Sequence, residues 1–230
     1  MLSIIIPTLQ EEKYIADTIR HLRVLTIPHE IIVSDGGSSD RTVEIASAEG
    51  ARVVMSTEVR TPSHQRNGGA RAATGEFLLF LDSSVIIPEP EKFVRSALAH
   101  FESASVVGFA VPQWIYPERA TLTDRVMCAI INWTLRVQHG GSGKFVMVRR
   151  SAFDALGGFR EDLVTREDGD FHIRLKKLGT VIYDPSLYIY YSGRREHAVG
   201  WPKLLWIWMT NVLWVSLFNK ALAKEWTPVR

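Results

Sequence analysis

Cysteine is almost missing from this chain of 230 residues, which contains only Cys128. A single cysteine can form neither an intrachain disulfide nor a cysteine-based metal cluster, so the composition suits a reducing compartment. The first apolar segment carries no basic n-region and no cleavage motif, so we expect no secretion signal. Together these features predict a cytoplasmic protein.

The chain also has little excess of either charge, because 27 Lys and Arg are nearly balanced by 25 Asp and Glu. A duplex-binding protein needs a clustered basic face, so we expect no nucleic-acid partner. No G-x-G-x-x-G follows the first apolar run and no G-x-x-x-x-G-K-[ST] occurs anywhere. A Rossmann dinucleotide site and a P-loop are therefore not expected. The hydrophobic fraction of 46% is that of a folded globular protein.

Short apolar runs alternate with amphipathic segments along the chain. We expect strands at 2–6, 30–33, 52–55, 77–81, 106–111, 144–149, 181–183 and 189–191. Helices are expected at 11–22, 41–48, 91–101, 121–137 and 201–220, with two more beginning at Thr61-Pro62 and at the capping-box pattern Ser151 to Asp154. Pro7 is expected to stop the first strand. This alternation predicts an α/β fold with a mostly parallel central sheet flanked by helices.

Polar side chains follow three of these strands directly. Thr8 follows the first strand, Asp35 the second, and Asp82 the apolar run Phe77–Leu81. A single acid after a strand is usually a turn or cap residue. Three polar groups on neighbouring parallel strands would instead converge on one crevice, where open α/β sheets bind their ligands. Asp40 is better placed than Asp35 to cap the next helix, which leaves Asp35 for binding.

A series of short motifs follows in order over residues 1–200. They are Ile4-Ile5-Ile6-Pro7-Thr8 with Glu11-Glu12, Ile32-Val33-Ser34-Asp35-Gly36-Gly37-Ser38-Ser39-Asp40-Arg41-Thr42, Arg66-Asn67, Gly75-Glu76-Phe77-Leu78-Leu79-Phe80-Leu81-Asp82, Gly157-Gly158-Phe159, Glu167-Asp168-Gly169-Asp170 and Arg174-Leu175. This ordered set resembles the family 2 glycosyltransferases. The resemblance implies a GT-A fold and the inverting transfer of a sugar from a UDP- or GDP-linked donor to an acceptor hydroxyl.

The same resemblance implies a division of the chain. Residues 1–200 would form a single GT-A glycosyltransferase domain, with a nucleotide-sugar-binding half at 1–111 and an acceptor and catalytic half at 112–200. Residues 201–230 would hold an apolar C-terminal helix. The residues implied to bind the nucleotide sugar are Pro7, Thr8, Glu11, Asp35, Arg66, Asp82 and Ser84.

Asp168 is implied to be the general base that takes the proton from the acceptor hydroxyl. Its neighbour Glu167, together with Arg60, Arg194 and Arg195, would contact phosphate or acceptor. Other interpretations stay open at this stage. Thr165-x-x-Asp168 has the spacing of a capping box, Glu11 would be favourable in the first turn of a helix, and Arg194-Arg195 could be a solvated basic loop.

The Asp-x-Asp motif of the family is incomplete here, because it reads Asp82-Ser83-Ser84. The resemblance implies a divalent cation, Mg²⁺ or Mn²⁺, that neutralises the diphosphate and is bound by the last acid of the motif. Such hard cations prefer charged oxygen ligands, and Ser84 offers only a neutral hydroxyl. Asp82 would then need help from a second ligand such as His197, or arginine forks would have to compensate the phosphate charge directly.

The C-terminal helix is very apolar and rich in tryptophan. Leu204 to Phe218 spans about 22 Å at ~1.5 Å per residue, which is shorter than the ~30 Å hydrocarbon core of a bilayer. Asn211 also interrupts the run. We therefore expect peripheral contact with a membrane surface, on its cytoplasmic face, and a lipid-linked or otherwise apolar acceptor. Packing on the protein's own core and burial in a homo-oligomer are the alternatives.

Two other functions compete with transfer. A catalytically silent homologue that binds a nucleotide sugar or a protein partner is motivated by Ser84, although the retained Asp168 argues against it. A sugar-nucleotide pyrophosphorylase would show a glycine-rich basic loop after the first strand, and Pro7-Thr8-Leu9-Gln10-Glu11 is not such a loop.

Overall fold

The computed structural model describes residues 1–221, so positions 222–230 of the predicted segment 201–230 lie outside the described residues. The elements in chain order are β1 (Leu2–Thr8), α1 (Ile15–Leu22), β2 (His29–Asp35), α2 (Thr42–Ala48), β3 (Arg52–Met55), α3 (Pro62–Ala72), β4 (Phe77–Leu81), β5 (Val85–Ile86), α4 (Pro90–His100), β6 (Val106–Ala110), β7 (Gln113–Ile115), α5 (Leu122–Gln138), β8 (Phe145–Arg149), α6 (Arg150–Ala155), α7 (Glu167–Leu175), β9 (Thr180–Tyr183), β10 (Ile189–Tyr191), α8 (Arg194–Val199) and α9 (Trp201–Phe218).

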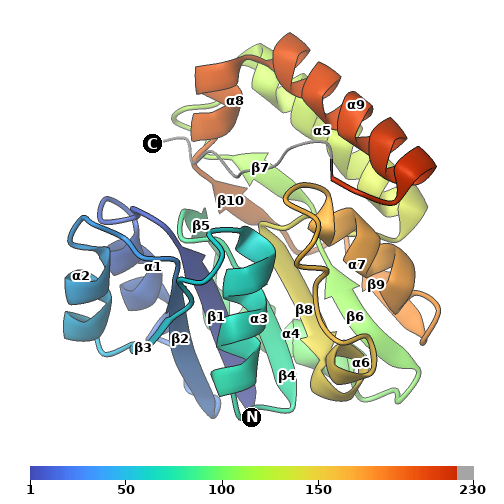
Figure 1. Ribbon diagram of the computed structural model, residues 1–230. Coiled ribbons are helices and arrows are strands. Elements are labelled where there is room, and N and C mark those ends of the chain that lie inside the picture. The colour runs from blue at the N-terminus through green and yellow to red at the C-terminus, as the bar shows by residue number, and fades with distance from the viewer. Residues whose placement is uncertain (222–230) are drawn as a thin grey trace.

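A seven-stranded sheet with the order β3-β2-β1-β4-β8-β6-β9 forms the centre of the molecule (Figure 1). Strands β3, β2, β1 and β4 are parallel neighbours, and β6 pairs in parallel with β9. Strand β8 runs antiparallel to both of its neighbours. A small sheet with the order β5-β10-β7 lies beside the large one. The expected α/β fold with a mostly parallel sheet flanked by helices is confirmed.

Both faces of the large sheet are covered, which explains why its strands are apolar at successive positions. On one face, Ile4 and Ile6 of β1 belong to a core cluster with residues of α1 and α4, including Ile19 and Phe93. On the other face, Ile5 belongs to a second cluster with residues of α3, α6 and α7. Because side chains of a strand alternate between faces, one apolar run supplies both cores.

Three local expectations are wrong. Strand β1 was expected to stop at Pro7 but continues to Thr8. Proline has no N–H, but β4 pairs with β1 only as far as Ile5, so no hydrogen bond to β4 is lost at Pro7. Helix α1 begins at Ile15, since an isolated turn closed on the carbonyl of Glu11 precedes it. The capping box expected at Ser151 does not form, because α6 begins at Arg150 and no side chain caps it.

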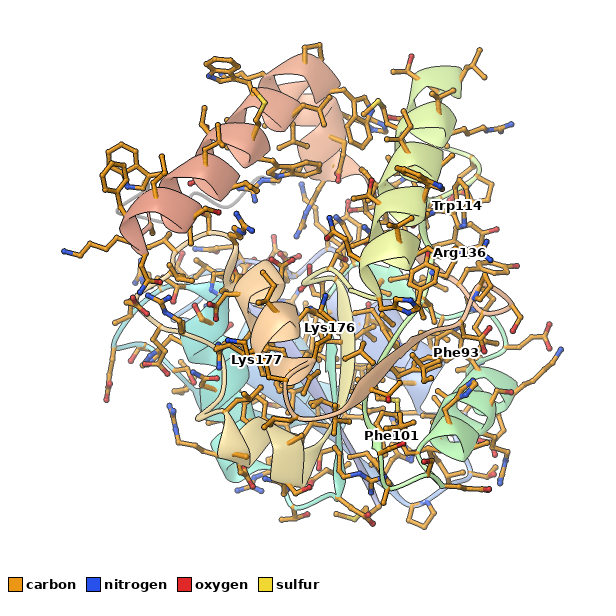
Figure 2. All side chains as sticks on the ribbon, turned by 90° about the vertical axis from the view of Figure 1, so that its right-hand side faces the viewer. Phe93, Phe101, Trp114, Arg136, Lys176 and Lys177 are labelled. Carbon is orange, nitrogen blue, oxygen red and sulfur yellow. The ribbon has the colours of Figure 1, made fainter. Side chains whose placement is uncertain are left out.

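The C-terminal part of the described chain lies at one end of the molecule. Helices α5, α8 and α9 are at the top in Figure 1, and α5 and α9 remain at that end in the view turned by 90° (Figure 2). The helix expected at 201–220 is confirmed as α9. No helix among residues 1–221 combines the length and the apolar character that a membrane span requires.

Candidate functional site

The three polar groups predicted at strand ends follow strands that are neighbours in the sheet. Strand β1 lies between β2 and β4, and Thr8 stands in register with Asp35. The hydroxyl of Thr8 donates a hydrogen bond of 2.8 Å to Oδ2 of Asp35. Asp82 directly follows β4 on the other side of β1. The three polar groups therefore lie at the carboxyl ends of adjacent strands, at one edge of the sheet.

The carboxylate of Asp35 is fully engaged within the protein. Its Oδ1 accepts bonds from the backbone N–H groups of Gly37 (2.9 Å) and Ser38 (2.7 Å). Its Oδ2 accepts bonds from the hydroxyls of Thr8 (2.8 Å) and Ser38 (2.6 Å). A carboxylate offers about four acceptor positions, and all are used. Asp35 thus shapes the loop after β2, and a ligand donor would have to displace one of the two hydroxyls.

Arg66 on α3 joins the end of β4 to the start of α7. The arginine is 3% exposed. Its Nη1 donates to Oε1 of Glu167 at 2.7 Å, and its Nη2 lies 3.3 Å from Oδ1 of Asp82. Helix α3 is fixed at its start by Thr61, whose hydroxyl accepts a bond from the N–H of His64. This ion-pair cluster holds an acid of the donor side beside the pair of acids at 167 and 168.

The peptide group of Gly143 connects Arg66 to the predicted base. Nη2 of Arg66 donates to the carbonyl of Gly143 at 2.9 Å, and the N–H of Gly143 donates to Oδ2 of Asp168 at 2.7 Å. A Cβ at position 143 would lie 2.8 Å from Nη2 of Arg66. Glycine is required here by this close approach. The only sequence signal of this role is the glycine content of the turn 140–143, which has glycine at positions 140, 141 and 143.

The capping box expected at Thr165-x-x-Asp168 is wrong. The hydroxyl of Thr165 bonds to the side chain of Asn211 at 2.9 Å, and Arg166 precedes α7 in a left-handed conformation with φ of 65°. The carboxylate of Asp168 accepts its other bond from the N–H of Gly169 at 2.7 Å. Asp168 is therefore oriented towards the Gly143 turn rather than towards Thr165.

Glu167 is the acid in this cluster whose titration is most affected. Burial and the neighbouring charge of Asp168 raise its pKa, and although Arg66 opposes them, the pKa reaches about 7. The folded protein then retains a proton between pH 4.5 and about 7 that the unfolded chain has released. Stability therefore falls as the pH rises through this window, by up to ~1.4 kcal/mol per pH unit for one proton.

Replacement of Glu167 by Gln should remove this pH dependence. We expect the free energy of unfolding of the wild type, relative to Glu167→Gln, to decrease as the pH is raised through the window and to level off above it. Urea unfolding at a series of pH values measures this difference, because all other groups titrate alike in both proteins. Parallel stability curves would show that Glu167 is ionised throughout.

Helix α8 brings a basic residue to Glu11, which lies just after β1. The guanidinium of Arg194 forms a bidentate ion pair with Glu11, including a bond of 2.8 Å to Oε2, and its carbon lies 5.1 Å from the ring centre of Tyr14. Arg194 is thus not a solvated loop residue.

Lys144, which follows the Gly143 turn, lies 3.5 Å from the buried carboxylate of Glu196. Burial lowers the pKa of Arg195.

The remaining predicted residues lie in different surroundings. Ser84 is buried, and its hydroxyl accepts a bond of 3.1 Å from Ser192. Arg60 is exposed and lies against the turn at Gly37. Nε2 of His197 is hydrogen bonded to Asp124 at 3.0 Å. For His197 to serve as a metal ligand, its other ring nitrogen, Nδ1, would have to bind the metal while this bond orients the ring.

The donor atoms at the crevice suit a cation that arrives with a diphosphate. Among residues 1–221 no group of three or more His, Cys, Asp and Glu side chains could hold a metal. Asp82 is the carboxylate at the predicted position, and Arg66 already pairs with it. Mg²⁺ is commonly bound by one or two carboxylates together with substrate phosphates and water. Asp82 fits that arrangement but would not hold a cation by itself.

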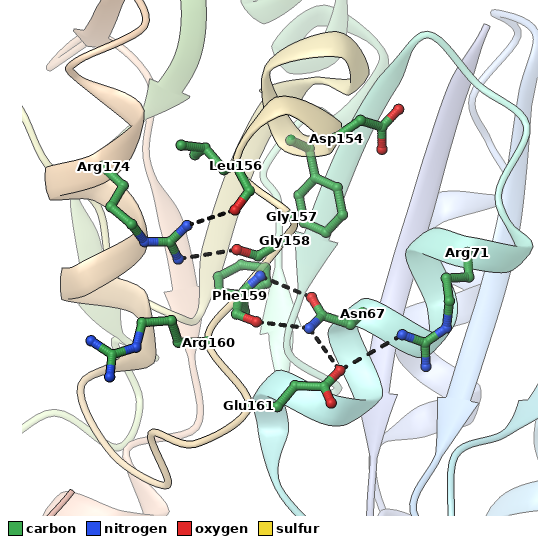
Figure 3. Close-up of a pocket in the computed structure, with 11 residues that line it drawn as sticks. Asn67, Arg71, Asp154, Leu156, Gly157, Gly158, Phe159, Arg160, Glu161 and Arg174 are labelled. Carbon is green, nitrogen blue, oxygen red and sulfur yellow. Dashed lines mark hydrogen bonds and ion pairs between the residues drawn. The ribbon is translucent and has the colours of Figure 1, made fainter. Parts of the chain in front are cut away.

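A pocket of about 520 Å³ lies between α3 and the 156–161 loop (Figure 3). Asn67 forms one wall: its side chain donates to the carbonyl of Phe159 at 2.8 Å and accepts from the N–H of the same residue at 2.9 Å. Arg174 donates to two carbonyls of the loop and to Asp170. The polar groups of this pocket are used to hold the loop, so the Arg66-Asn67 motif has one site-facing and one structural residue.

A family model described as "Glycosyl transferase family 2" matches residues 3–157. The succinoglycan biosynthesis protein ExoA of Rhizobium meliloti (strain 1021) is 27% identical over 223 residues, which cover 86% of this chain and 65% of that protein. The chain thus spans less than two thirds of the length of this relative.

Solved structures show the same fold. The mannosyltransferase PcManGT from Pyrobaculum calidifontis in complex with GDP-Man and Mn²⁺ matches with a TM-score of 0.69 and 19% identity, over 83% of this chain and 56% of that one. TarS of S. aureus in complex with UDP-GlcNAc matches with a TM-score of 0.67 and 21% identity, over 97% of this chain and 68% of that one. The predicted GT-A fold is confirmed.

Proposed function

Because this chain belongs to glycosyl transferase family 2, we propose that it transfers a sugar from a nucleotide diphosphate sugar to an acceptor hydroxyl, with inversion at the anomeric carbon. The observation that carries the proposal is the cluster in which Arg66 joins Asp82 to Glu167 and, through Gly143, to Asp168. It supports the proposal because the acid that would bind the donor and the acid that would act as base are joined through one arginine. Residues 1–111 would bind the donor, and residues 112–200 would supply the base and the acceptor side.

The nucleoside end of the donor would lie at the carboxyl ends of β1 and β2. Pro7 and Thr8 form the end of β1, and Glu11 with its partner Arg194 closes the opposite side. Asp35 accepts a hydrogen bond from the base edge in this proposal once the hydroxyl of Thr8 or Ser38 turns away. This exchange costs little, because each hydroxyl can rotate to another acceptor.

The diphosphate would lie between this end and Asp82. Arg194 and Arg195 on α8, with Arg60 near the turn after β2, are the arginines that would contact its oxygens, since guanidinium forks match phosphate geometry. Arg66 is already committed to two carboxylates and a carbonyl, so its part is to orient them. The buried Ser84 would border the sugar end of the donor.

A divalent cation bound with the diphosphate would stabilise the charge of the leaving group, and Asp82 is the residue that would hold it. PcManGT was solved with Mn²⁺ and GDP-Man, which supports this assignment by likeness of fold. Asp168 removes the acceptor proton as the acceptor oxygen attacks the anomeric carbon. Its two hydrogen bonds, from Gly143 and Gly169, hold its carboxylate against the turn.

The acceptor in this proposal is lipid-linked or otherwise apolar. The turn that precedes Asp168 contacts α9, because Thr165 bonds to Asn211 and Arg166 donates to the carbonyl of Val212 at 2.7 Å. Most large apolar side chains of α9 are exposed. A membrane-associated helix would thus stand next to the base, on the cytoplasmic face of the membrane.

Calorimetric titration with UDP, GDP and dTDP, each with and without Mn²⁺ or Mg²⁺, tests the donor side. We expect one uridine or guanosine nucleotide to bind, and the cation to strengthen binding only in the presence of the diphosphate, because the protein supplies one carboxylate. Binding unaffected by the cation would assign charge compensation to the arginines. If none of the nucleotides binds, the proposal of a nucleotide-sugar transferase is wrong.

A donor-hydrolysis assay separates transfer from the second candidate, a silent homologue that binds a nucleotide sugar or a protein partner. The observation behind that alternative is Ser84, which lies buried against Ser192 where the family motif has an acid. Nucleotide binding without any release of sugar, in the presence of the cation, would favour it.

A further inference from the structure

Helix α5 buries only part of its surface. Its buried residues are Asp124, Cys128 and Asn132, and Met127 and Ile131 pack against the core beside them. The side chain of Asn132 accepts a bond of 2.9 Å from the N–H of Gln113 and donates one of 3.0 Å to the carbonyl of the same residue, which fixes α5 against β7. The outer side carries a stripe at helical spacing in which every side chain is more than half exposed: Leu122, Val126, Ile130, Trp133 and Val137. An apolar stripe on the outer side of a surface helix is unusual, because that side is normally polar.

Helix α9 also exposes apolar residues. Its buried side holds Trp201 and Leu204 together with Asn211, whose amide is satisfied by the carbonyl of Ile207 at 2.8 Å and by Thr165. Exposed apolar residues include Trp206, Met209, Val212, Leu213, Trp214 and Leu217. These positions are distributed around most of the helix. A helix that is apolar nearly all round needs an apolar environment.

The charge of this surface has one sign. Helix α9 contains no Asp or Glu, and the single acid of α5, Asp124, is buried. Asp124 accepts bonds from the indole of Trp201 at 2.7 Å and from His197, and so ties the starts of α5, α8 and α9 together. The exposed charged residues of the two helices are Arg125, Arg136 and Lys203. Such a surface complements an anionic partner.

We propose that α5 and α9 together form one surface that rests in the interface of an anionic lipid bilayer. Both helices lie at the same end of the molecule in two perpendicular views (Figures 1 and 2). Tryptophans at positions 133, 206 and 214 suit headgroup depth, and the basic residues suit anionic headgroups. The proposal extends the contact of α9 suggested above to a second helix, whose exposed stripe becomes visible only in the fold.

A bilayer fits this surface better than a second copy of the chain. A protein partner covers one stripe of a helix, and the apolar residues of α9 extend beyond one stripe. A second copy would also bring together two patches whose exposed charges, Arg125, Arg136 and Lys203, are all basic, because a two-fold interface uses the same patch twice. Anionic lipid satisfies both the apolar and the basic groups.

Flotation of the full chain with vesicles tests the proposal. We expect flotation with vesicles of phosphatidylcholine and phosphatidylglycerol, weaker flotation with phosphatidylcholine alone, and a decrease in the first with added salt. The double variant Val126→Asp with Ile130→Asp in α5 should reduce the bound fraction at least about tenfold, as should Leu213→Asp with Leu217→Asp in α9, since each loses two apolar side chains from the interface.

The matched control is Val24→Asp, because Val24 is 58% exposed and lies after α1, outside the proposed surface. It should float like the wild type. Wild-type protein that stays with the soluble fraction in both lipids overturns the proposal, and so does an α5 variant that floats normally. Dimers in gel filtration that the α5 variant dissociates would assign the surface to a second copy. Nucleotide binding by the same variants would show that they are folded. The membrane surface is also tested separately from sugar transfer, because only the proposed lipid-linked acceptor connects the two.

Discussion

Replacement of Asp168 by Asn is expected to slow sugar transfer by ~10²–10⁴, the usual worth of a general base. Asn keeps the size of the side chain and an oxygen that can accept the bond of 2.7 Å from the N–H of Gly143. It cannot take a proton at neutral pH. The variant should therefore fold normally and bind the nucleotide with nearly wild-type affinity, because the nucleoside end lies at β1 and β2. Turnover of the donor with acceptor, next to calorimetric nucleotide binding, measures both quantities.

Asp170→Asn is the control for that experiment. Asp170 lies on the same helix, but its carboxylate accepts a bond of 2.6 Å from Nε of Arg174, in the pair that holds the 156–161 loop. We expect a small loss of stability and a turnover close to that of the wild type. Near-normal transfer by Asp168→Asn would remove Asp168 from the mechanism, whereas equal losses in both variants would indicate a structural role for the start of α7.

The strand ends of the donor half could be predicted because they depend on local signals. Apolar runs that end in Thr8, Asp35 and Asp82 identify both the strands and their carboxyl ends. Parallel order then brings these ends to one edge of the sheet, without knowledge of any side-chain contact. The family motifs added Asp168, whose carboxylate the structure places against the turn before β8.

The connections between these groups could not be predicted, because they join distant parts of the chain. Arg66 and Glu167 are 101 positions apart, and the pair forms because α3 and α7 cover the same face of the sheet. The family resemblance implied that Arg66 binds the nucleotide sugar, and the structure shows it buried between carboxylates. In the same way, the existence of α5 was predicted but its exposed face was not. Asn132 helps to fix that orientation by bonding to β7.

Gly143→Ala should lower kcat by about 10², although no side chain is removed. The new Cβ would lie 2.8 Å from Nη2 of Arg66 and 3.4 Å from Oδ2 of Asp168. Arg66 cannot retreat easily, because Glu167 and Asp82 hold its guanidinium in a buried position. The turn must therefore shift, and a displacement of about 1 Å at a catalytic group can cost this much in rate. Steady-state kinetics should show the loss in kcat, with the KM for the donor little changed.

Gly140→Ala in the same turn distinguishes positioning of the base from simple damage to the turn. A Cβ at position 140 would meet nothing closer than Cβ of Gln138 at 3.9 Å. This control should leave the rate unchanged. Gly143→Ala should lose turnover while nucleotide binding stays close to that of the wild type, because the displaced peptide group is the one that bonds to Asp168. A parallel loss of nucleotide binding would mean that the turn supports the fold and does not hold the base; an unchanged rate would mean that Asp168 is oriented from elsewhere.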